Sequence, residues 1–139
     1  MLIRQGVPPQ MGNGRSRLIG GRRRLPKGVF ITLDAGWTTA KGTTFLFTAP
    51  PGLADAALSF NGLTIGEQYR LTFAALSPSN YGTMAFRPGV IGLETFINVD
   101  GAYSIDFTAA ETDGLPKIFS SDVLGGVEVN IINLRLVAI

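Results

Sequence analysis

The stretch Val127-Glu-Val-Asn-Ile-Ile-Asn-Leu-Arg-Leu-Val-Ala-Ile139 decides the fold class. In its first half, apolar residues alternate with polar ones, at Val127, Val129 and Ile131. The alternation then slips by one residue and continues at Ile132, Leu134, Leu136 and Ala138. A period of two predicts a β-strand with one buried face. A one-residue slip predicts a β-bulge, because the extra residue returns the apolar set to the same face and leaves Asn130 and Asn133 outside. The sequence therefore predicts one long, bent, central strand.

Shorter stretches before it also have the character of strands, separated by Gly, Pro, Asn and Asp. They are Val29–Asp34, Thr44–Thr48, Ala57–Phe60, Tyr69–Ala75, Thr83–Arg87, Glu94–Val99, Tyr103–Ala109 and Pro116–Ser120. No convincing amphipathic helix interrupts them. Many short strands with turn residues between them predict an all-β fold, an antiparallel sandwich.

The chain divides into an arm and a body. A length of 139 residues suits one domain with a sizeable core. Residues 1–28 show neither helical nor strand periodicity and are predicted to be an extended arm, whereas residues 29–139 form the sandwich. Glycine and proline repeatedly interrupt the arm, at Pro8, Pro9, Gly12, Gly14, Gly20, Gly21 and Pro26.

Charge follows the same division. Residues 1–33 hold seven basic residues and no acidic one, which gives +7, and residues 34–139 hold five basic and ten acidic residues, which gives −5. Charged residues make up only 16% of the chain, against about 25% in typical domains. The protein is therefore a basic arm on an acidic body, and we expect its uncovered apolar surface to lie at protein–protein contacts.

Several functions are disfavoured by composition. The chain has neither cysteine nor histidine, which removes Ser-His-Asp and Cys-His catalysis and the commonest metal ligands. No apolar run approaches the roughly 20 residues that cross a bilayer, and no stretch resembles a signal peptide. We therefore expect no enzyme activity, no catalytic residues, no cofactor, no metal and no membrane.

Two strands nearly repeat one another, Gly66-Glu-Gln-Tyr-Arg-Leu-Thr-Phe-Ala-Ala75 and Gly101-Ala-Tyr-Ser-Ile-Asp-Phe-Thr-Ala-Ala110. Followed by Gly125-Gly-Val-Glu-Val-Asn-Ile-Ile-Asn-Leu-Arg-Leu136, they resemble the jelly-roll sandwiches of the carbohydrate-binding-module type. That fold recurs in bacteriophage tail, fibre and capsid-decoration proteins. The resemblance covers residues 29–139 and implies a jelly roll and a place in a virion, although one such sandwich hosts many roles.

The arm supplies the main candidate binding residues: Arg15, Arg17, Arg22, Arg23 and Arg24, with Leu18, Ile19 and Leu25 beside them. The run of three arginines lacks the pattern of a phosphate loop. Arginine forms bidentate pairs with carboxylates, and the apolar residues would fill grooves, so we favour an acidic protein surface as the partner. Nucleic-acid binding stays as the alternative, less favoured because such arms are usually denser in charge.

Two further features of the body bear on function. Trp37 is the only tryptophan, and it would either anchor a ligand or partner by its ring or plug one end of the sandwich. The acidic residues Glu111, Asp113 and Asp122 lie close in sequence, but their spacing matches no calcium loop, so turn chemistry is the better interpretation.

Three functional hypotheses follow. The first is a bacteriophage capsid decoration or cement protein that binds the major capsid protein or another virion protein through its body and arm. The second is a carbohydrate-binding adsorption module of a tail or fibre, and the third is a small coat protein with a nucleic-acid-binding arm. We also expect self-association through sandwich edges or apolar loop tips, with a trimer as the arrangement that suits a capsid lattice.

Overall fold

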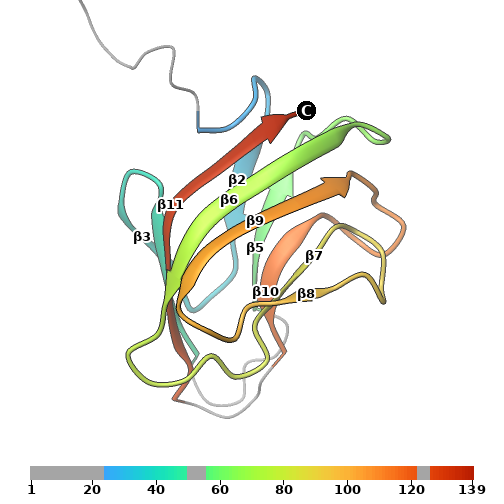
Figure 1. The fold of residues 1–139 in the computed structure, drawn as a ribbon. Coiled ribbons are helices and arrows are strands. Elements are labelled where there is room, and N and C mark those ends of the chain that lie inside the picture. The colour runs from blue at the N-terminus through green and yellow to red at the C-terminus, as the bar shows by residue number, and fades with distance from the viewer. Residues whose placement is uncertain (1–23, 50–55, 122–125) are drawn as a thin grey trace, which may run out of the picture.

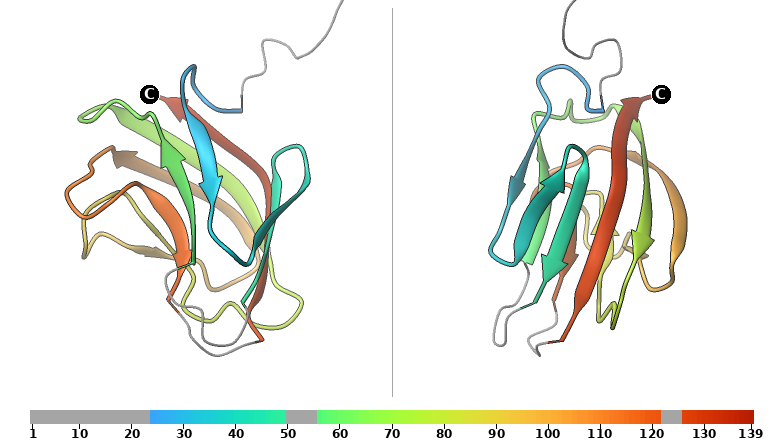
Figure 2. Two further views of the ribbon diagram at one scale, coloured as in Figure 1. Left: turned by 180° about the vertical axis from the view of Figure 1, so that it is seen from behind. Right: turned by 90° about the vertical axis from the view of Figure 1, so that its left-hand side faces the viewer.

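The computed structural model describes residues 24–49, 56–121 and 126–139, and these form two packed β-sheets (Figures 1 and 2). Each sheet has five antiparallel strands, in the orders β2-β5-β10-β7-β8 and β3-β4-β11-β6-β9. The all-β, antiparallel sandwich predicted from the sequence is confirmed. The strands are β2 (Phe30–Leu33), β3 (Trp37–Lys41), β4 (Thr44–Thr48), β5 (Ala56–Asn61), β6 (Gln68–Leu76), β7 (Ala85–Arg87), β8 (Thr95–Phe96), β9 (Gly101–Thr108), β10 (Lys117–Ser120) and β11 (Glu128–Ala138).

Strands β4 to β11 pair in a nested order. The first pairs with the last, β4 with β11, and the succession continues inward with β5 and β10, β6 and β9, and β7 and β8. A double-stranded ribbon folded over into two sheets produces this order, which is the arrangement of an eight-stranded jelly roll. The strand order thus supports the jelly-roll interpretation, with β2 and β3 added as outer strands.

The final strand is central, long and bulged, as predicted. In β11, the step from Ile132 to Arg135 spans three residues, while the opposite step in β6, from Ala74 to Thr72, spans two. Asn133 lies at the irregularity with a φ of 55°, a left-handed conformation that asparagine tolerates better than most residues.

One detail of the predicted core face is wrong. Ile132 still pairs in the register of the first half of β11 and is only half-buried, and Ala138 is exposed. The buried set resumes at Leu134 and Leu136, because the extra residue is inserted after Ile132 and not before it.

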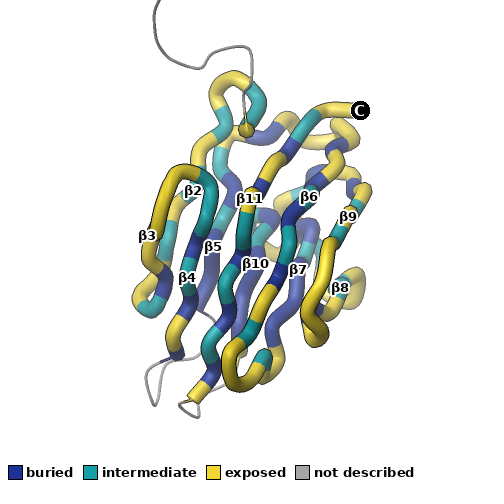
Figure 3. Tube along the Cα trace, turned by 60° about the vertical axis from the view of Figure 1, so that its left-hand side comes forward, coloured by how far each residue is buried: buried dark blue, intermediate teal, exposed yellow. Residues whose placement is uncertain are grey.

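The core lies between the two sheets (Figure 3). Alternate residues of each long strand face inward, so that buried and exposed positions alternate along β6 and β11. Each fully buried large apolar side chain contributes about 1.5–3 kcal/mol. Those with no more than 2% exposure include Phe47, Leu58, Phe60, Leu71, Phe86, Ile118, Val129, Ile131 and Leu136.

The sequence missed β3. Only the first of its residues, Trp37, is buried, and the rest of the strand is exposed at the edge of the sheet. An edge strand with one buried residue shows no alternation in sequence, so its period of two is invisible. The prediction also made several strands too long, since β2 holds only Phe30–Leu33, β7 begins at Ala85, and β8 holds only Thr95 and Phe96.

Candidate functional site

The structure describes two of the predicted arm residues, Arg24 and Leu25. The other six, Arg15, Arg17, Leu18, Ile19, Arg22 and Arg23, lie outside the described residues. The carbonyl oxygen of Arg24 accepts the Leu136 N–H at 2.8 Å. Leu25 is half-buried and packs against the core. The start of the described chain is thus fixed to the body at the central strand.

This attachment lies on one side of β11. The Leu134 N–H donates to Thr43 at the β3–β4 turn, and the Leu136 N–H points the same way, to Arg24. The Ile139 N–H points the opposite way, to Gln68 of β6. The described chain therefore lies beside the part of β11 that extends beyond the first residue of β4, Thr44, on the side of the sandwich bordered by β2 and β3.

A small apolar groove lies at this point, with a volume of about 280 Å³. Leu25, Ile31, Phe45 and Leu134 are among its lining residues. The cations around the entry point are exposed, and neither Arg24, Lys27 nor Lys41 forms an ion pair within the described part of the chain. We call Arg24–Gly28, β2 and β3 the arm-root side; it carries positive charge that is free to meet a partner.

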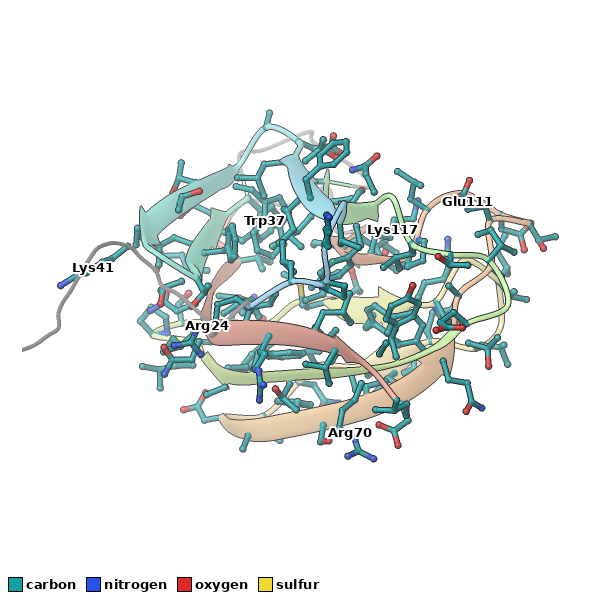
Figure 4. The ribbon with its side chains drawn as sticks, turned by 90° about the horizontal axis from the view of Figure 1, so that it is seen from above. Arg24, Trp37, Lys41, Arg70, Glu111 and Lys117 are labelled. Carbon is teal, nitrogen blue, oxygen red and sulfur yellow. The ribbon has the colours of Figure 1, made fainter. Side chains whose placement is uncertain are left out.

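Trp37 points into the sandwich and is 5% exposed (Figure 4). Its ring packs on Phe47 with centroids 4.9 Å apart and the planes tilted by 39°. Within the described residues its Nε1–H has no hydrogen-bond partner. This position favours packing over a surface-exposed aromatic platform, since the ring face is already covered.

The opposite side of the sandwich is acidic. Residues 94–113 contain five acidic residues and no basic one. They form β8, β9 and the loop after β9, and Figure 4 shows Glu111 on the side away from Arg24 and Lys41. We call this region, residues 88–113, the β8–β9 edge. Sequence reasoning missed it as a site, although the absence of any basic residue from a run of this length was the available signal.

Two of these acids are neutralised by arginines from neighbouring strands. Arg70 of β6 donates to both oxygens of Asp106 at 2.7 and 2.9 Å, and Arg87 of β7 contacts Glu94 at 2.6 Å. The hydrogen bond from each arginine lowers the pKa of its partner carboxyl. Counting these two arginines, the β8–β9 edge keeps a charge of −3, from five acids and two bases.

The remaining acids lie beyond the two ends of β9. Asp100 precedes it and accepts the Tyr81 hydroxyl at 2.6 Å and the Ser77 N–H at 3.1 Å. The Tyr81 hydrogen bond lowers the pKa of Asp100, while burial and then that same bond raise the pKa of Tyr81. Glu111 and Asp113 follow β9, and Asp113 accepts the Ile91 N–H at 2.9 Å.

Exposed apolar side chains accompany these acids. Of the eight large hydrophobic residues found exposed in the described chain, four lie in residues 91–99: Ile91, Leu93, Phe96 and Val99, each 61–63% exposed. A groove of about 250 Å³ separates β8 from β9 and is lined in part by Leu93, Thr95, Ile105 and Phe107. The groove itself is lined by Asp106, which Arg70 neutralises, and the acids without an arginine partner lie elsewhere on the same edge. An edge that carries both an apolar groove and such acids suits a segment that is both apolar and cationic.

Metal-binding and membrane-spanning features are absent from the described ranges. Residues 24–49, 56–121 and 126–139 contain no group of three or more Asp, Glu, His or Cys placed to hold a metal ion. Asp122, one of the three acids that lie close in sequence, is outside these ranges. The same part of the chain contains no helix long and apolar enough to cross a membrane.

Comparison with protein-family models gives no match to this chain, and comparison with curated protein sequences gives none either. Function is therefore inferred from the surfaces described above.

Proposed function

We propose that this protein is a non-enzymatic structural protein of a virion, specifically a decoration or cement protein on a bacteriophage capsid. The observation that carries the proposal is the charge division. A basic arm with no acidic residue in residues 1–33 leaves a rigid, acidic sandwich from a side whose exposed cations have no ion-pair partner in the described residues. The major capsid protein is the proposed partner.

The sandwich suits this role because it is a fixed platform for the arm. The Leu136 N–H holds Arg24 at the central strand, and Leu25 is packed against the core, so the arm starts from a defined place. Anchoring at Arg24 reduces the conformational entropy lost when the arginines that precede it bind. Guanidinium groups then form bidentate pairs with shell carboxylates, which fix geometry as well as charge.

The test is co-sedimentation of the purified protein with intact and emptied particles of its own source. We expect binding that saturates at a fixed ratio to the shell protein. Replacing Arg22, Arg23 and Arg24 together by Lys should weaken it at least tenfold, because lysine keeps the charge and loses the planar fork. Arg135→Lys is the matched control, because it makes the same change at an exposed arginine of β11 outside the arm and the arm-root side, and it should bind as the original protein does.

Two other results would overturn the proposal. The first is a protein that binds free nucleic acid but not emptied particles, with equal salt sensitivity for the original protein and the triple-lysine variant. This result would indicate a nucleic-acid-binding arm. Binding to a glycan array, with no binding to shells, would indicate an adsorption module. Because Trp37 is buried, a glycan site would have to use other side chains.

A further inference from the structure

The free side of β9 is the longest open strand edge that the structure describes next to an apolar groove. β9 has eight residues and pairs only with β6. The Ala109 N–H donates to Glu67, in register with the β6–β9 ladder, so odd-numbered residues of β9 face β6. In an antiparallel ladder the even-numbered residues then point their N–H and C=O groups away from the sheet. These are Ala102, Ser104, Asp106 and Thr108.

An open row of this kind is a template for one more strand. The strand that fits would place apolar side chains in the groove between Leu93 and Ile105, and cations near Glu111 at the end of β9. β9 itself carries few of the devices that block pairing, since it contains no proline and no lysine. The β8–β9 edge therefore calls for an extended, basic and partly apolar segment.

The arm contains such a segment. Arg15-Ser-Arg-Leu-Ile19 is five residues long, has no glycine or proline, and combines two arginines with Leu18 and Ile19. Its net charge of +2 opposes the −3 of the β8–β9 edge. At the arm-root side it would meet Arg24, Lys27 and Lys41, which repel it.

We infer that residues 15–19 of one copy of this chain add as a strand to the free side of β9 in a second copy. The chain's own β9 is out of reach of this segment. Arg24 lies one strand position from β11, and the free side of β9 lies three positions away on the other side, so the path is about 19 Å at about 4.8 Å per strand. The five steps from Ile19 to Arg24 span at most about 18 Å when fully extended, and the chain would also have to pass over outward side chains, which lengthens the path.

The contact joins unlike surfaces, the arm of one copy and the β8–β9 edge of the next. Such a head-to-tail contact closes into a ring or continues as a chain of copies. It needs no shell. A test on the purified protein alone therefore fails or succeeds independently of the proposed attachment to a capsid.

The experiment uses three full-length proteins and measures mass by sedimentation. The edge variant is Ser104→Pro, which removes one outward N–H at an exposed edge position, where proline is tolerated. The arm variant carries Arg15→Glu and Arg17→Glu. We expect the original protein to associate and each variant alone to be monomeric. A mixture should form a one-to-one complex that grows no further, because only one intact arm and one intact edge remain.

Controls keep the outcome interpretable. Ser104→Ala retains the N–H and should associate like the original protein. If Ser104→Pro loses cooperative unfolding, Leu93→Lys replaces it as the edge variant, since Leu93 lines the groove, is 61% exposed, and a lysine there would repel the basic segment without removing a backbone N–H. Hydrogen exchange provides a second measurement: the amides of Ser104 and Asp106 should exchange at least tenfold more slowly in the associated protein than in the arm variant.

A monomeric original protein at every accessible concentration would overturn the inference. So would an edge variant that still associates, or two monomeric variants that fail to combine, because each result removes arm-to-edge contact between copies.

Discussion

The two sides of the sandwich differ in whether their strand edges are covered and in the sign of their charge. On the arm-root side, the open part of β11 is covered by Arg24, and the exposed cations have no ion-pair partner in the described chain. On the β8–β9 edge, the side of β9 away from β6 is uncovered, and four of its eight residues point their backbone N–H and C=O groups outward. Exposed apolar residues and a charge of −3 accompany this open side. One side sends out a basic segment and the other is suited to receive one. The two sides of the sandwich are therefore different and complementary in charge and in open backbone, although both are edges of the same two-layer core.

The largest expected effect concerns glycines that hold loops against each side. A Cβ at Gly89, on the β8–β9 edge, would overlap the carbonyl of Ala110, and the backbone there has a φ of 108°. Both atoms of that carbonyl belong to the backbone and cannot turn aside. We expect Gly89→Ala to lower the free energy of unfolding by about 3–5 kcal/mol, from overlap together with left-handed strain.

Two related glycines calibrate this prediction. Gly62→Ala would overlap the carbonyl of Gly28 and should cost less, about 2–3 kcal/mol, because Gly28 lies in an exposed turn whereas Ala110 is half-buried. Gly92→Ala is the control, with a φ of 95° and open space around its Cβ, and should cost only about 1–2 kcal/mol. Urea denaturation of the three variants would contradict the comparison if Gly62→Ala were the most harmful.

The second prediction concerns where the arm ends. Deleting residues 1–23 should leave the unfolding free energy within about 0.5 kcal/mol of the original, measured at a concentration where both proteins are monomeric. Deleting residues 1–28 also removes the packing of Leu25 and the acceptor for Leu136, and should cost a further 1–3 kcal/mol, about the sum of a partly buried leucine and one hydrogen bond. Equal stability of the two truncated proteins would show that residues 24–28 do not support the body.

The third prediction concerns the bulge between the two sides. Asn133→Val should cost about 1–2 kcal/mol, because a β-branched residue is strained at a φ of 55°, whereas Asn133→Gly should be neutral or slightly stabilising. Asn130→Val, on the outer face of the same strand, is the control and should change stability by less than about 0.5 kcal/mol. If both valine variants behave alike in thermal unfolding, the bulge imposes no strain.

Much of the sandwich was predictable because a strand that is buried on one face has apolar and polar residues in alternation. Tyr69, Leu71 and Phe73 alternate in β6, and the slip in the apolar pattern of β11 predicted its bulge. The position of the extra residue was harder to predict, because Ile131 and Ile132 are equally apolar. Only the course of the backbone decides that Ile131 is buried and Ile132 is half-buried.

The surfaces were harder to predict for physical reasons. Strand β3 carries a single buried residue, so it leaves no periodic signal. The β8–β9 edge depends on which strands end up outermost, and β8 and β9 lie at the edges of different sheets. The basic arm and the acidic run of residues 94–113 are both visible in the sequence, but the sequence does not show that this run forms an outermost strand of each sheet.

The smallest expected effect is the response of the β8–β9 edge to acid. Hydrogen bonds from Tyr81 and Arg70 lower the pKa values of Asp100 and Asp106. A carboxyl whose folded pKa lies below its unfolded value of about 3.9 contributes stability that is fully present above that value and is lost as pH falls through the folded pKa. Denaturation midpoints should therefore fall between about pH 5 and about pH 2, with a shallower fall for Asp106→Asn and Asp100→Asn. Glu111→Gln, which removes an exposed carboxyl outside these contacts, controls for the loss of charge alone.

The Arg70–Asp106 pair is exposed, so high salt should weaken its contribution to the stability of the fold. Hydrogen exchange during acidification should rise first in β9 and later in β2 and β3, and a simultaneous rise in all three would show that these carboxylates do not distinguish the two sides.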